Sequence, residues 1–454
     1  MKTTKIIIFF LLAALLVTSG FKCGGPPAGL TLGKPQPVTL EYWKVFEESS
    51  DVQDLISAYQ KEHPHIVINY RNFTYDEYEK QLVRALAEDR GPDIFSINTT
   101  WMREYQSLIS PLPATVTIAY QVTKGTIKKE TYTEMRTKKT LTLRDVKALF
   151  PDVIYDNQVI NDQIYGLPLS IDTLALYYNR DLLNNAGISN PPTNWDEFRE
   201  DVIKLTKQDS KGNIIQSGAA IGTATNVARS PDIISLLMMQ NGTPMTDSNG
   251  YATFNQKPTG YQRELPPAAE ALNFYNGFAS PATQSYTWNE NLPNSLESFM
   301  SGKTAFFFGY AYNLSTIKAR APKLNFEIAK MPQVGTPINF ANYWTETVSK
   351  KSKNQNEAWD FIIFMTTNEE MNKTYLQKSR LPIALRNLII TQTDDLELAP
   401  FADQILTSRS WYKGKDAEAS DKILEEMISG NLEGILKTNE IVSLAVQKIN
   451  QTYK

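Results

Sequence analysis

Residues 38–97 read VTLEYWKVFEESSDVQDLISAYQKEHPHIVINYRNFTYDEYEKQLVRALAEDRGPDIFSI, and this stretch decides the fold. Runs rich in β-branched and aromatic residues at Val38–Val45, Ile66–Tyr70 and Asp93–Ile97 predict three strands. Between them, apolar residues recur at helical spacing after Ser50 and after Thr74, which predicts two helices. Strands that alternate with helices predict an α/β fold with a mainly parallel sheet covered by helices.

The same pattern returns later in the chain. Strand-like runs occur at Gly166–Asn179, Thr304–Gly309 and Phe326–Met331, and the part after Asn354 is mostly helical in pattern. A chain of 454 residues is long enough for at least two domains. Ligands of open parallel sheets bind beyond the carboxyl ends of the strands, so the segments Trp43–Glu48 and Asn98–Arg103 are predicted to face a ligand.

The amino-terminal segment predicts export. Lys2 and Lys5 precede an unbroken apolar run, Ile6–Val17, so residues 1–22 are predicted to be a signal peptide. Cys23, the single cysteine, is expected to carry a lipid anchor, as in bacterial lipoproteins, although Lys22 before it departs from their usual pattern. Cleavage after residue 20 and an uncleaved anchor are the alternatives. Residues 23–37, rich in Gly and Pro, are predicted to form a flexible tether.

The composition excludes several kinds of chemistry. The net charge of −3 and the lack of a Lys/Arg run argue against nucleic acid as a partner. The two histidines, His63 and His65, lie where a predicted helix passes into the amino end of a strand, away from the expected ligand edge, so neither a nucleophile–histidine pair nor a zinc site is expected. No Gly-rich phosphate loop occurs. We therefore predict no metal and no cofactor, while a pair of hydrolytic carboxylates stays open.

Aromatic residues at strand ends and in loops suggest a ligand surface. The chain contains 7 Trp, 22 Tyr and 20 Phe. The notable positions are Trp43, Trp101, Tyr310, Tyr312, Trp344, Trp411 and Tyr412. Flat aromatic faces match the apolar faces of sugar rings, and acidic, amide and Arg side chains match the hydroxyl groups. Ordinary packing in the hydrophobic core is the alternative interpretation for each of them.

One stretch departs from the α/β pattern. Residues 115–139 alternate apolar and polar side chains around a turn at Lys124-Gly125, which predicts a protruding β-hairpin. Its basic residues are interpreted as a solvated face, and a docking surface for a partner is the alternative.

Five blocks occur in order along the chain after the export segment. They are VTLEYWKVF (Val38–Phe46), GPDIFSI (Gly91–Ile97), YGLPLSIDTLALYYNRDLLNNAGISNPPTNWDEF (Tyr165–Phe198), FMSGKTAFFFG (Phe299–Gly309) and VSKKSKNQNEAWDFIIFM (Val348–Met365). Together they resemble the extracellular solute-binding proteins of the maltose-binding type (family 1), which serve ABC importers. The resemblance covers nearly the whole mature chain.

This resemblance implies a two-lobed periplasmic-binding-protein fold with the ligand in the cleft between the lobes. The expected first lobe comprises residues 38–168 and 309–340, with an inserted hairpin at about 115–147. The expected second lobe comprises residues 169–308 and 341–454. The chain is expected to cross between lobes near Leu167–Ile171, Phe307–Gly309 and Ile338–Tyr343.

The resemblance also implies which residues contact the ligand. The expected positions are Trp43, Glu47, Asn98, Trp101, Asp172, Tyr178, Tyr310, Tyr312, Trp344, Glu346, Arg380 and Trp411. Trp101, Tyr310, Trp344 and Trp411 are expected to stack on it. Glu47, Asp172 and Arg380 are expected to bind its hydroxyl groups.

The resemblance implies the substrate-binding component of an ABC importer, a monomer that captures a small polar ligand, most simply a mono- or oligosaccharide, and delivers it to permease subunits. It would be anchored at the outer face of the cell membrane. Two alternatives stay open at this stage, a surface-anchored binding or sensor protein without a transport role and a secreted glycoside-active enzyme.

Overall fold

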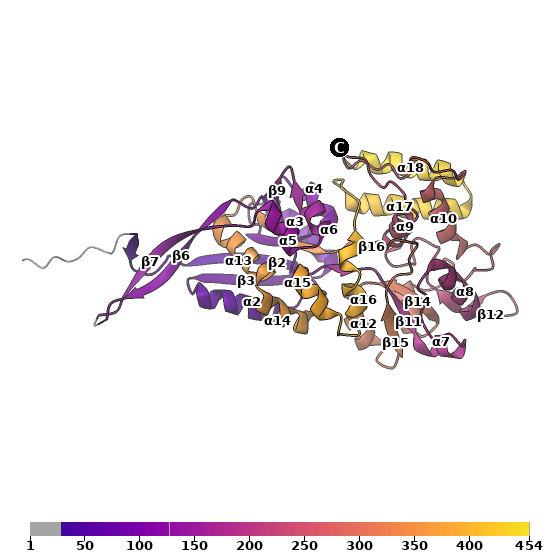
Figure 1. The fold of residues 1–454 in the computed structure, drawn as a ribbon, viewed down its shortest axis with the longest axis horizontal. Helices are drawn as coiled ribbons and strands as arrows, with labels where there is room; N and C mark the ends of the chain where they lie inside the picture. Colours follow the sequence, from indigo (N-terminus) through magenta and orange to yellow (C-terminus); the bar gives the residue numbers. More distant parts are fainter. Residues whose placement is uncertain (1–28, 127, 454) are drawn as a thin grey trace, which may run out of the picture.

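The computed structural model describes residues 29–126 and 128–453. The predicted signal peptide, residues 1–22, and the predicted lipid-bearing Cys23 lie outside this part of the chain. Two lobes lie one after the other along the long axis of the molecule (Figure 1). Among the described residues, no helix has the length and apolar character needed to cross a membrane.

The first lobe is built on a five-stranded sheet of order β3-β2-β4-β17-β5. The strands are β2 (Val38–Val45), β3 (Ile66–Phe73), β4 (Ile94–Asn98), β5 (Ile109–Ser110) and β17 (Trp344–Ser349). β2 is parallel to β3 and β4, whereas β17 is antiparallel to β4 and β5. Its main helices are α2 (Ser49–Glu62), α3 (Tyr75–Ala87), α13 (Gln355–Thr367) and α14 (Glu369–Ser379).

Both faces of this sheet are buried, as expected for a mainly parallel sheet. Leu40 and Tyr42 of β2 belong to one hydrophobic cluster, and Val45 belongs to another. Tyr42 meets Phe361 of α13 edge-on, with ring centroids 6.1 Å apart. The helices therefore cover the sheet on both sides and leave its carboxyl edge for the cleft.

The second lobe has a five-stranded sheet of order β12-β13-β14-β11-β15. Its strands are β11 (Ala175–Asn179), β12 (Lys207–Gln208), β13 (Ile214–Ala219), β14 (Thr304–Gly309) and β15 (Phe326–Ala329). Its main helices are α7 (Arg180–Asn185), α8 (Trp195–Leu205), α9 (Ser230–Gln240), α10 (Pro267–Gly277), α11 (Ser295–Met300), α12 (Asn313–Arg320), α17 (Ala417–Glu433) and α18 (Thr438–Gln451).

A three-stranded sheet connects the lobes at the three places where the chain passes from one to the other. It is formed by β10 (Asp172–Thr173), β16 (Asn339–Asn342) and β18 (Ser408–Arg409), with β16 in the middle. Two of these strands lie at or beside the expected crossings. The crossing expected at Phe307–Gly309 is wrong, because β14 lies inside the second lobe, and the third connection is instead β18.

The expected division of the later chain between lobes is wrong in two places, although α17 and α18 lie in the second lobe as expected. Residues 309–340, expected in the first lobe, contain β15, which pairs with β11 of the second. Residues 341–454, expected in the second lobe, contain β17, which completes the first sheet beside β4. The order of strands in a sheet depends on contacts between residues far apart in sequence. The sequence of each strand therefore did not indicate to which lobe β15 and β17 belong.

The predicted hairpin forms and extends from the first lobe, away from the second lobe (Figure 1). β6 (Thr115–Lys124) and β7 (Glu130–Lys139) pair antiparallel along their whole length, and the rest of the expected insertion leads into helix α5 (Leu143–Leu149). Part of the predicted tether is ordered, because β1 (Leu30–Leu32) pairs with β7. We call the sheet of β1, β6 and β7 the arm.

Candidate functional site

A cavity of about 450 Å3 lies between the two lobes, over the connecting strand β16. Both lobes supply its walls. The first-lobe side includes Phe46, Tyr75, Glu79, Asn98, Trp101, Glu104 and Trp344. The second-lobe side, with the segment after β18, includes Arg229, Asp232, Tyr312, Trp411, Tyr412, Asp416, Glu418 and Asp421. We call this cavity the cleft.

Aromatic rings from both lobes meet at the cleft. The ring of Phe46 is nearly parallel to two others, that of Tyr75 of the first lobe at a centroid distance of 6.1 Å and that of Tyr312 of the second at 6.0 Å. The Tyr312 contact joins the lobes directly. Phe46 is 48% exposed and Tyr75 is 52% exposed, so part of each ring stays open to a ligand.

The backbone at Phe46 is arranged to present this ring. Its φ of 71° lies in the left-handed region, which a bulky residue rarely adopts. The amide of Glu47 donates to the carbonyl oxygen of Val45 over 2.9 Å, which closes a three-residue turn around Phe46. Such a conformation costs about 1–3 kcal/mol and tends to occur at binding sites, where surrounding contacts hold it in place.

The pairing of β17 with β4 places the indole ring of Trp344 at the carboxyl edge of the first sheet. Trp344 stands opposite Asn98, the last residue of β4. Its ring meets that of Trp101 edge-on, with centroids 5.2 Å apart, and also meets Phe46 at 5.9 Å. The antiparallel strand thus adds an aromatic side chain where a parallel sheet binds its ligands.

The charge of the cleft is strongly negative. Its one arginine, Arg229, is bound through two hydrogen bonds of 2.8 Å to Asp232, and it lies 3.5 Å from Asp421. The remaining four carboxylates are Glu79, Glu104, Asp416 and Glu418. None of these four has an ion-pair partner within 4.0 Å among the described residues. An anionic ligand would therefore be repelled, whereas sugar hydroxyls find acceptors.

Two of these carboxyl groups have raised pKa values. Burial, together with the negative charges of Glu79 and Asp416, raises the pKa of Glu104 to about 7. Burial also raises the pKa of Asp421 to about 7, although Arg229 opposes the shift. Glu104 belongs to the first lobe and Asp416 to the second, so closing the cleft brings like charges together.

We expect an uncharged ligand to bind more tightly as the pH is lowered from about 8 to about 5.5. The cleft holds Glu104 at a pKa above its usual range, and a bound ligand that buries it further favours the protonated form, so this contribution to binding is present at low pH and is lost as the pH rises through about 7. Because Glu104 is only partly withdrawn from solvent, we expect a gain of only several-fold. Calorimetric titration at several pH values would measure it. Glu104→Gln should flatten the pH dependence, and an unchanged slope would contradict this origin.

Five of the twelve expected ligand positions line the cleft. They are Asn98, Trp101, Tyr312, Trp344 and Trp411. Trp411 is nevertheless 94% buried, and its indole nitrogen donates to Ser235 over 2.9 Å, so it offers only an edge. The other seven expected positions lie outside the cleft.

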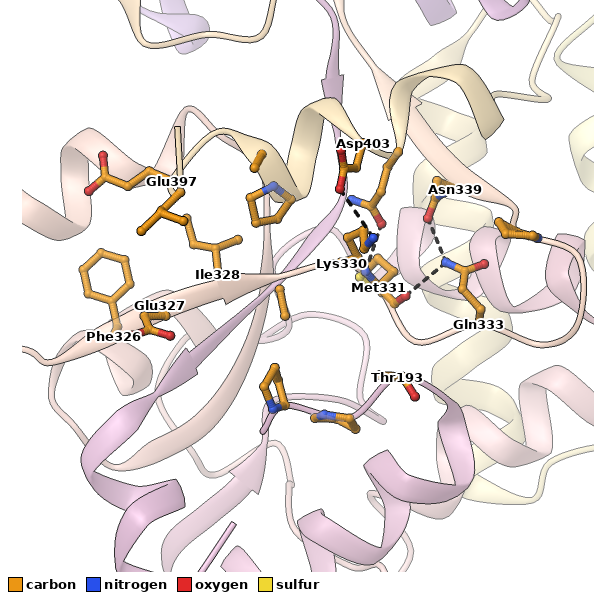
Figure 2. Close-up of a pocket in the computed structure, with 18 of the residues that line it drawn as sticks. Thr193, Phe326, Glu327, Ile328, Lys330, Met331, Gln333, Asn339, Glu397 and Asp403 are labelled. Atoms are coloured by element: carbon orange, nitrogen blue, oxygen red, sulfur yellow. Dashed lines mark hydrogen bonds and ion pairs between the residues drawn. The ribbon is translucent and has the colours of Figure 1, made fainter. Parts of the chain in front are cut away.

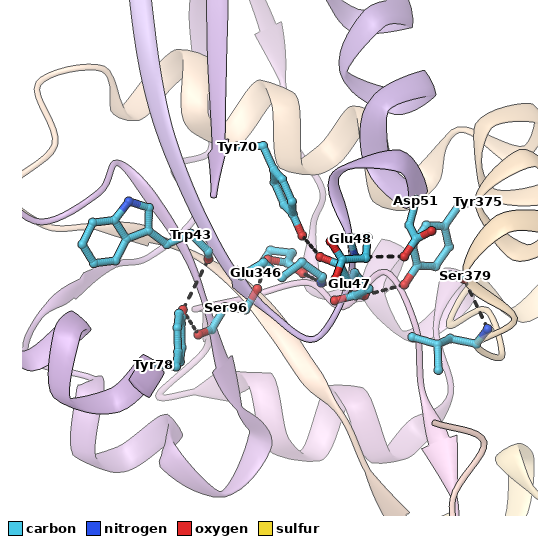
Figure 3. A network of polar contacts seen from close by, with 12 residues as sticks. Trp43, Glu47, Glu48, Asp51, Tyr70, Tyr78, Ser96, Glu346, Tyr375 and Ser379 are labelled. Atoms are coloured by element: carbon cyan, nitrogen blue, oxygen red, sulfur yellow. Dashed lines mark hydrogen bonds and ion pairs between the residues drawn. The ribbon is translucent and has the colours of Figure 1, made fainter. Parts of the chain in front are cut away.

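Glu47 and Glu346 belong to a buried ionic network under the first sheet's carboxyl edge (Figure 3). Lys44 pairs with both, at 3.2 Å from Glu47 and with a direct hydrogen bond to Glu346. The hydroxyl groups of Tyr375 and Ser96 donate to Glu47 and Glu346 over 2.6 and 2.5 Å. Both carboxylates therefore have their hydrogen-bond and ion-pair partners inside the lobe. They lie next in sequence or within two residues of Phe46 and Trp344 and help to hold that part of the backbone in place.

Asp172 is a structural residue of the connecting sheet. Its carboxylate accepts hydrogen bonds from the backbone amides of Thr173, Ala311 and Tyr312 at 2.9, 3.0 and 3.3 Å. Burial raises its pKa to about 7, and these amides oppose the shift. It positions the segment that carries Tyr312 and does not reach the cleft.

Four further positions are also corrected, because other contacts occupy their side chains. Trp43 packs on Phe73 with centroids 4.9 Å apart, on the side of β2 opposite Tyr42. Tyr178 donates to Glu327. Tyr310 is fully buried and donates to Asp232 over 2.6 Å.

The fourth is Arg380. It binds Asp395 through two hydrogen bonds of 2.6 and 3.0 Å, and it also binds Glu397 at 3.0 Å. Its guanidinium group is thereby held on the surface between α14 and the segment that leads to β18, where it cannot bind a ligand in the cleft.

A larger hollow of about 970 Å3 lies on another side of the second lobe (Figure 2). It runs between β15 and the segment Leu396–Thr407. Its polar groups largely bind one another, as in the pairs Lys330–Asp403 at 3.4 Å and Gln333–Asn339 at 2.9 Å. Phe326 is its single aromatic wall residue. The cleft, where both lobes and many rings converge, is therefore the candidate ligand site.

Sequence reasoning missed Phe46, Tyr75, Arg229 and the acidic start of α17. Phe46 lies inside the segment Trp43–Glu48 that was expected at the ligand edge, and the structure turns Phe46 toward the cleft in place of Trp43 and Glu47. Tyr75 and Glu79 are one helical turn apart on α3 and share a face, a spacing that the sequence does show. Nothing local to Arg229 or α17 indicates that they face the first lobe.

Comparisons with known proteins agree with this architecture. A galactooligosaccharide-binding protein of Bacillus subtilis (strain 168) is 24% identical over 401 residues, which cover 86% of this chain and 82% of the relative. A maltooligosaccharide ABC transporter solute-binding lipoprotein of Streptococcus pneumoniae (strain ATCC BAA-255 / R6) is 22% identical over 312 residues, or 64% of this chain and 67% of the relative.

Solved structures show the same fold. An ABC substrate-binding protein from Listeria monocytogenes in complex with cycloalternan superposes with a TM-score of 0.69 at 17% identity, covering 92% of this chain and 99% of that one. The model of the family described as bacterial extracellular solute-binding protein matches residues 54–387. With most of both lobes inside that match, the chain belongs to the bacterial extracellular solute-binding proteins.

Proposed function

We propose that this protein is the substrate-binding component of an ABC importer and that it captures an uncharged oligosaccharide in the cleft. The observation that carries the proposal is the meeting of aromatic rings from both lobes around the cavity. Phe46, Tyr75 and Trp344 offer ring faces and edges to the apolar faces of sugar rings. The four carboxylates without an ion-pair partner offer acceptors to sugar hydroxyls.

The names of the relatives support a carbohydrate as the ligand, since two of them are described as binding galactooligosaccharides and maltooligosaccharides. The charge of the cleft narrows the class of carbohydrate that can bind. Four carboxylates without a cation partner disfavour sugar phosphates and uronic acids, whose negative charge would enter an already negative cavity.

Capture by hinge closure follows from the three connecting strands. A ligand that touches both lobes binds the closed arrangement better, so it shifts the population toward closure. The permease subunits of an importer could then distinguish loaded from empty protein. A single chain supplies both walls of the cleft, so we propose that it acts as a monomer.

A ligand screen by thermal unfolding tests the proposed function. The panel contains neutral mono- and oligosaccharides, polyols, peptides, sugar phosphates and uronic acids. A ligand at one hundred times its Kd stabilises the fold by about 2.7 kcal/mol. We expect hits among neutral oligosaccharides, recovered unaltered after incubation. A hit that is hydrolysed would establish an enzyme, and hits confined to peptides or to anionic sugars would overturn the assignment.

Cys23→Ser is expected to release the protein from membranes, because we propose that this cysteine bears the lipid anchor. The expected result is a shift of the protein from the membrane fraction to the soluble fraction after cell lysis, followed by immunoblotting. Thr31→Ser, a similarly small change a few residues later, is the control and should stay membrane-bound. A Cys23→Ser protein that remains with the membrane would show that an uncleaved segment is the anchor.

A further inference from the structure

The arm is the one prominent feature of the described chain that ligand capture leaves unexplained. Its strands project from the first lobe at the end of the molecule farthest from the second lobe (Figure 1). The cleft opens between the lobes, so the arm lies outside the ligand site. Its inner part packs on the lobe, where Val116 and Ile118 are buried, and its outer part is open to solvent.

The arm is basic, whereas the rest of the chain is acidic. Residues 115–139 contain six Lys or Arg and two Glu, a net charge of +4 in a chain whose total is −3, so all other residues together carry −7. Three lysines, Lys124, Lys128 and Lys129, cluster at its outer end. Of these, Lys128 pairs with Glu130 at 2.9 Å but stays 85% exposed.

The route of the chain brings the amino-terminal segment to this same outer end. β1 pairs with β7 in the register Leu30↔Glu134 to Leu32↔Tyr132, a few residues from the turn of the hairpin. The amide of Gly33 also donates to the carbonyl oxygen of Thr131 over 2.9 Å. Cys23 is six residues before Gly29, a span of roughly 20 Å at full extension. Whatever holds the amino-terminal segment at a membrane therefore holds the outer arm near that membrane.

We propose that the arm docks on anionic phospholipid headgroups and so orients the anchored protein on the membrane surface. This inference rests on the proposed export of the protein to the outer face of the cell membrane. Anionic headgroups attract clustered lysines within about one Debye length, roughly 8 Å at physiological salt. The acidic body would be repelled by the same surface, so the charge separation favours one orientation, with the arm toward the membrane and the cleft away from it.

Co-sedimentation with vesicles tests the docking. All members of the four hydrophobic clusters lie between Leu30 and Ile449, so a chain that starts at Gly24 keeps the whole core and lacks the export segment. We expect it to bind vesicles of equal parts phosphatidylglycerol and phosphatidylcholine, to bind pure phosphatidylcholine vesicles at least about tenfold more weakly, and to dissociate in about 1 M salt.

Charge-removing variants locate the interaction. Lys124→Gln/Lys128→Gln/Lys129→Gln is expected to weaken binding to the anionic vesicles at least tenfold, since each lysine near such a surface contributes on the order of fivefold. Lys207→Gln/Lys211→Gln/Lys323→Gln removes the same charge from exposed positions of the second lobe and should change binding less than twofold. Equal losses in both variants, or equal binding of wild type to both vesicle types, would overturn the proposal.

A protein partner would give a different result. Binding to native membranes that is lost in the arm variant, without binding of the wild type to protein-free anionic vesicles, would mean that the arm docks on a membrane protein and would refute phospholipid docking. The arm variant should keep the ligand response of the wild type in the thermal screen. Failure of that screen for both proteins would count against the proposed function and would leave the vesicle result standing.

Discussion

Replacement of Lys44 by Met is expected to lower the free energy of unfolding by about 3–5 kcal/mol. Lys44 is 1% exposed, and among the described residues it is the single cation that contacts the buried carboxylates of Glu47 and Glu346. Burial alone would lower the pKa of Lys44, but the two carboxylates outweigh it and hold the pKa above its usual range. Without the ammonium group, two negative charges would face each other in a site that excludes water.

Urea denaturation at neutral pH would measure the loss. Lys61→Met makes the same chemical change on the exposed last turn of α2 and should alter stability by no more than about 0.5 kcal/mol. Adding Glu47→Gln and Glu346→Gln to Lys44→Met removes the uncompensated charges and should restore much of the stability. A loss below about 1 kcal/mol for Lys44→Met would show that the network is solvated or rearranges, contrary to its burial.

Replacement of Trp344 by Ala is expected to weaken ligand binding by about 1–3 kcal/mol, or roughly 5- to 150-fold in Kd. Trp344 lines the cleft and stands in the middle of the aromatic wall, with Trp101 at 5.2 Å and Phe46 at 5.9 Å. Its loss would remove a ring face from the ligand and also the support of its two neighbours. Isothermal titration with the oligosaccharide identified in the screen would give the affinity.

Two comparisons separate stacking from a general effect on folding. Trp344→Phe keeps a ring and should retain part of the affinity. Tyr251→Ala removes an exposed aromatic ring that stacks on Tyr453, at a centroid distance of 5.1 Å and outside the cleft, and should leave the affinity unchanged. If folded Trp344→Ala protein bound as tightly as the wild type, Trp344 would be a packing residue only.

The local elements of the fold could be predicted because their signals are local. β2, β3 and β4 and the helices between them follow the alternation of hydrophobic residues in residues 38–97. The arm strands follow from period-two alternation on both sides of a Lys-Gly turn. The placement of β15 and β17 could not be predicted in this way. The run that contains β15 fits either sheet, and β17, with the sequence WTETVS, has too few apolar residues to stand out as a strand.

Residues of the candidate site could be predicted where they follow the carboxyl end of a strand. They were missed where the direction of the side chain determines whether a residue faces the cleft. Asn98 and Trp101 follow a strand whose carboxyl end must lie at the ligand edge, so they were found. Glu47 and Phe46 are neighbours in such a loop, yet a single turn with positive φ sends the ring of Phe46 to the cleft and the carboxylate of Glu47 into the lobe. The residue type alone does not tell which of the two side chains faces the cleft, because an aromatic or an acidic residue fits either position.

By itself the sequence determined that this is an α/β chain with a basic hairpin, many aromatic residues near strand ends, and none of the common nucleophile or phosphate-binding motifs, and it predicted export. Those properties depend on composition and short-range periodicity. Only the tertiary structure decided that Arg229 and the start of α17 face Phe46 across a negatively charged cleft, and that Lys44 neutralises the two acids expected to hold the ligand. These contacts could not be predicted because they join residues that are up to several hundred positions apart in sequence. Their energies also depend on how deeply the groups are buried, which no local sequence pattern encodes.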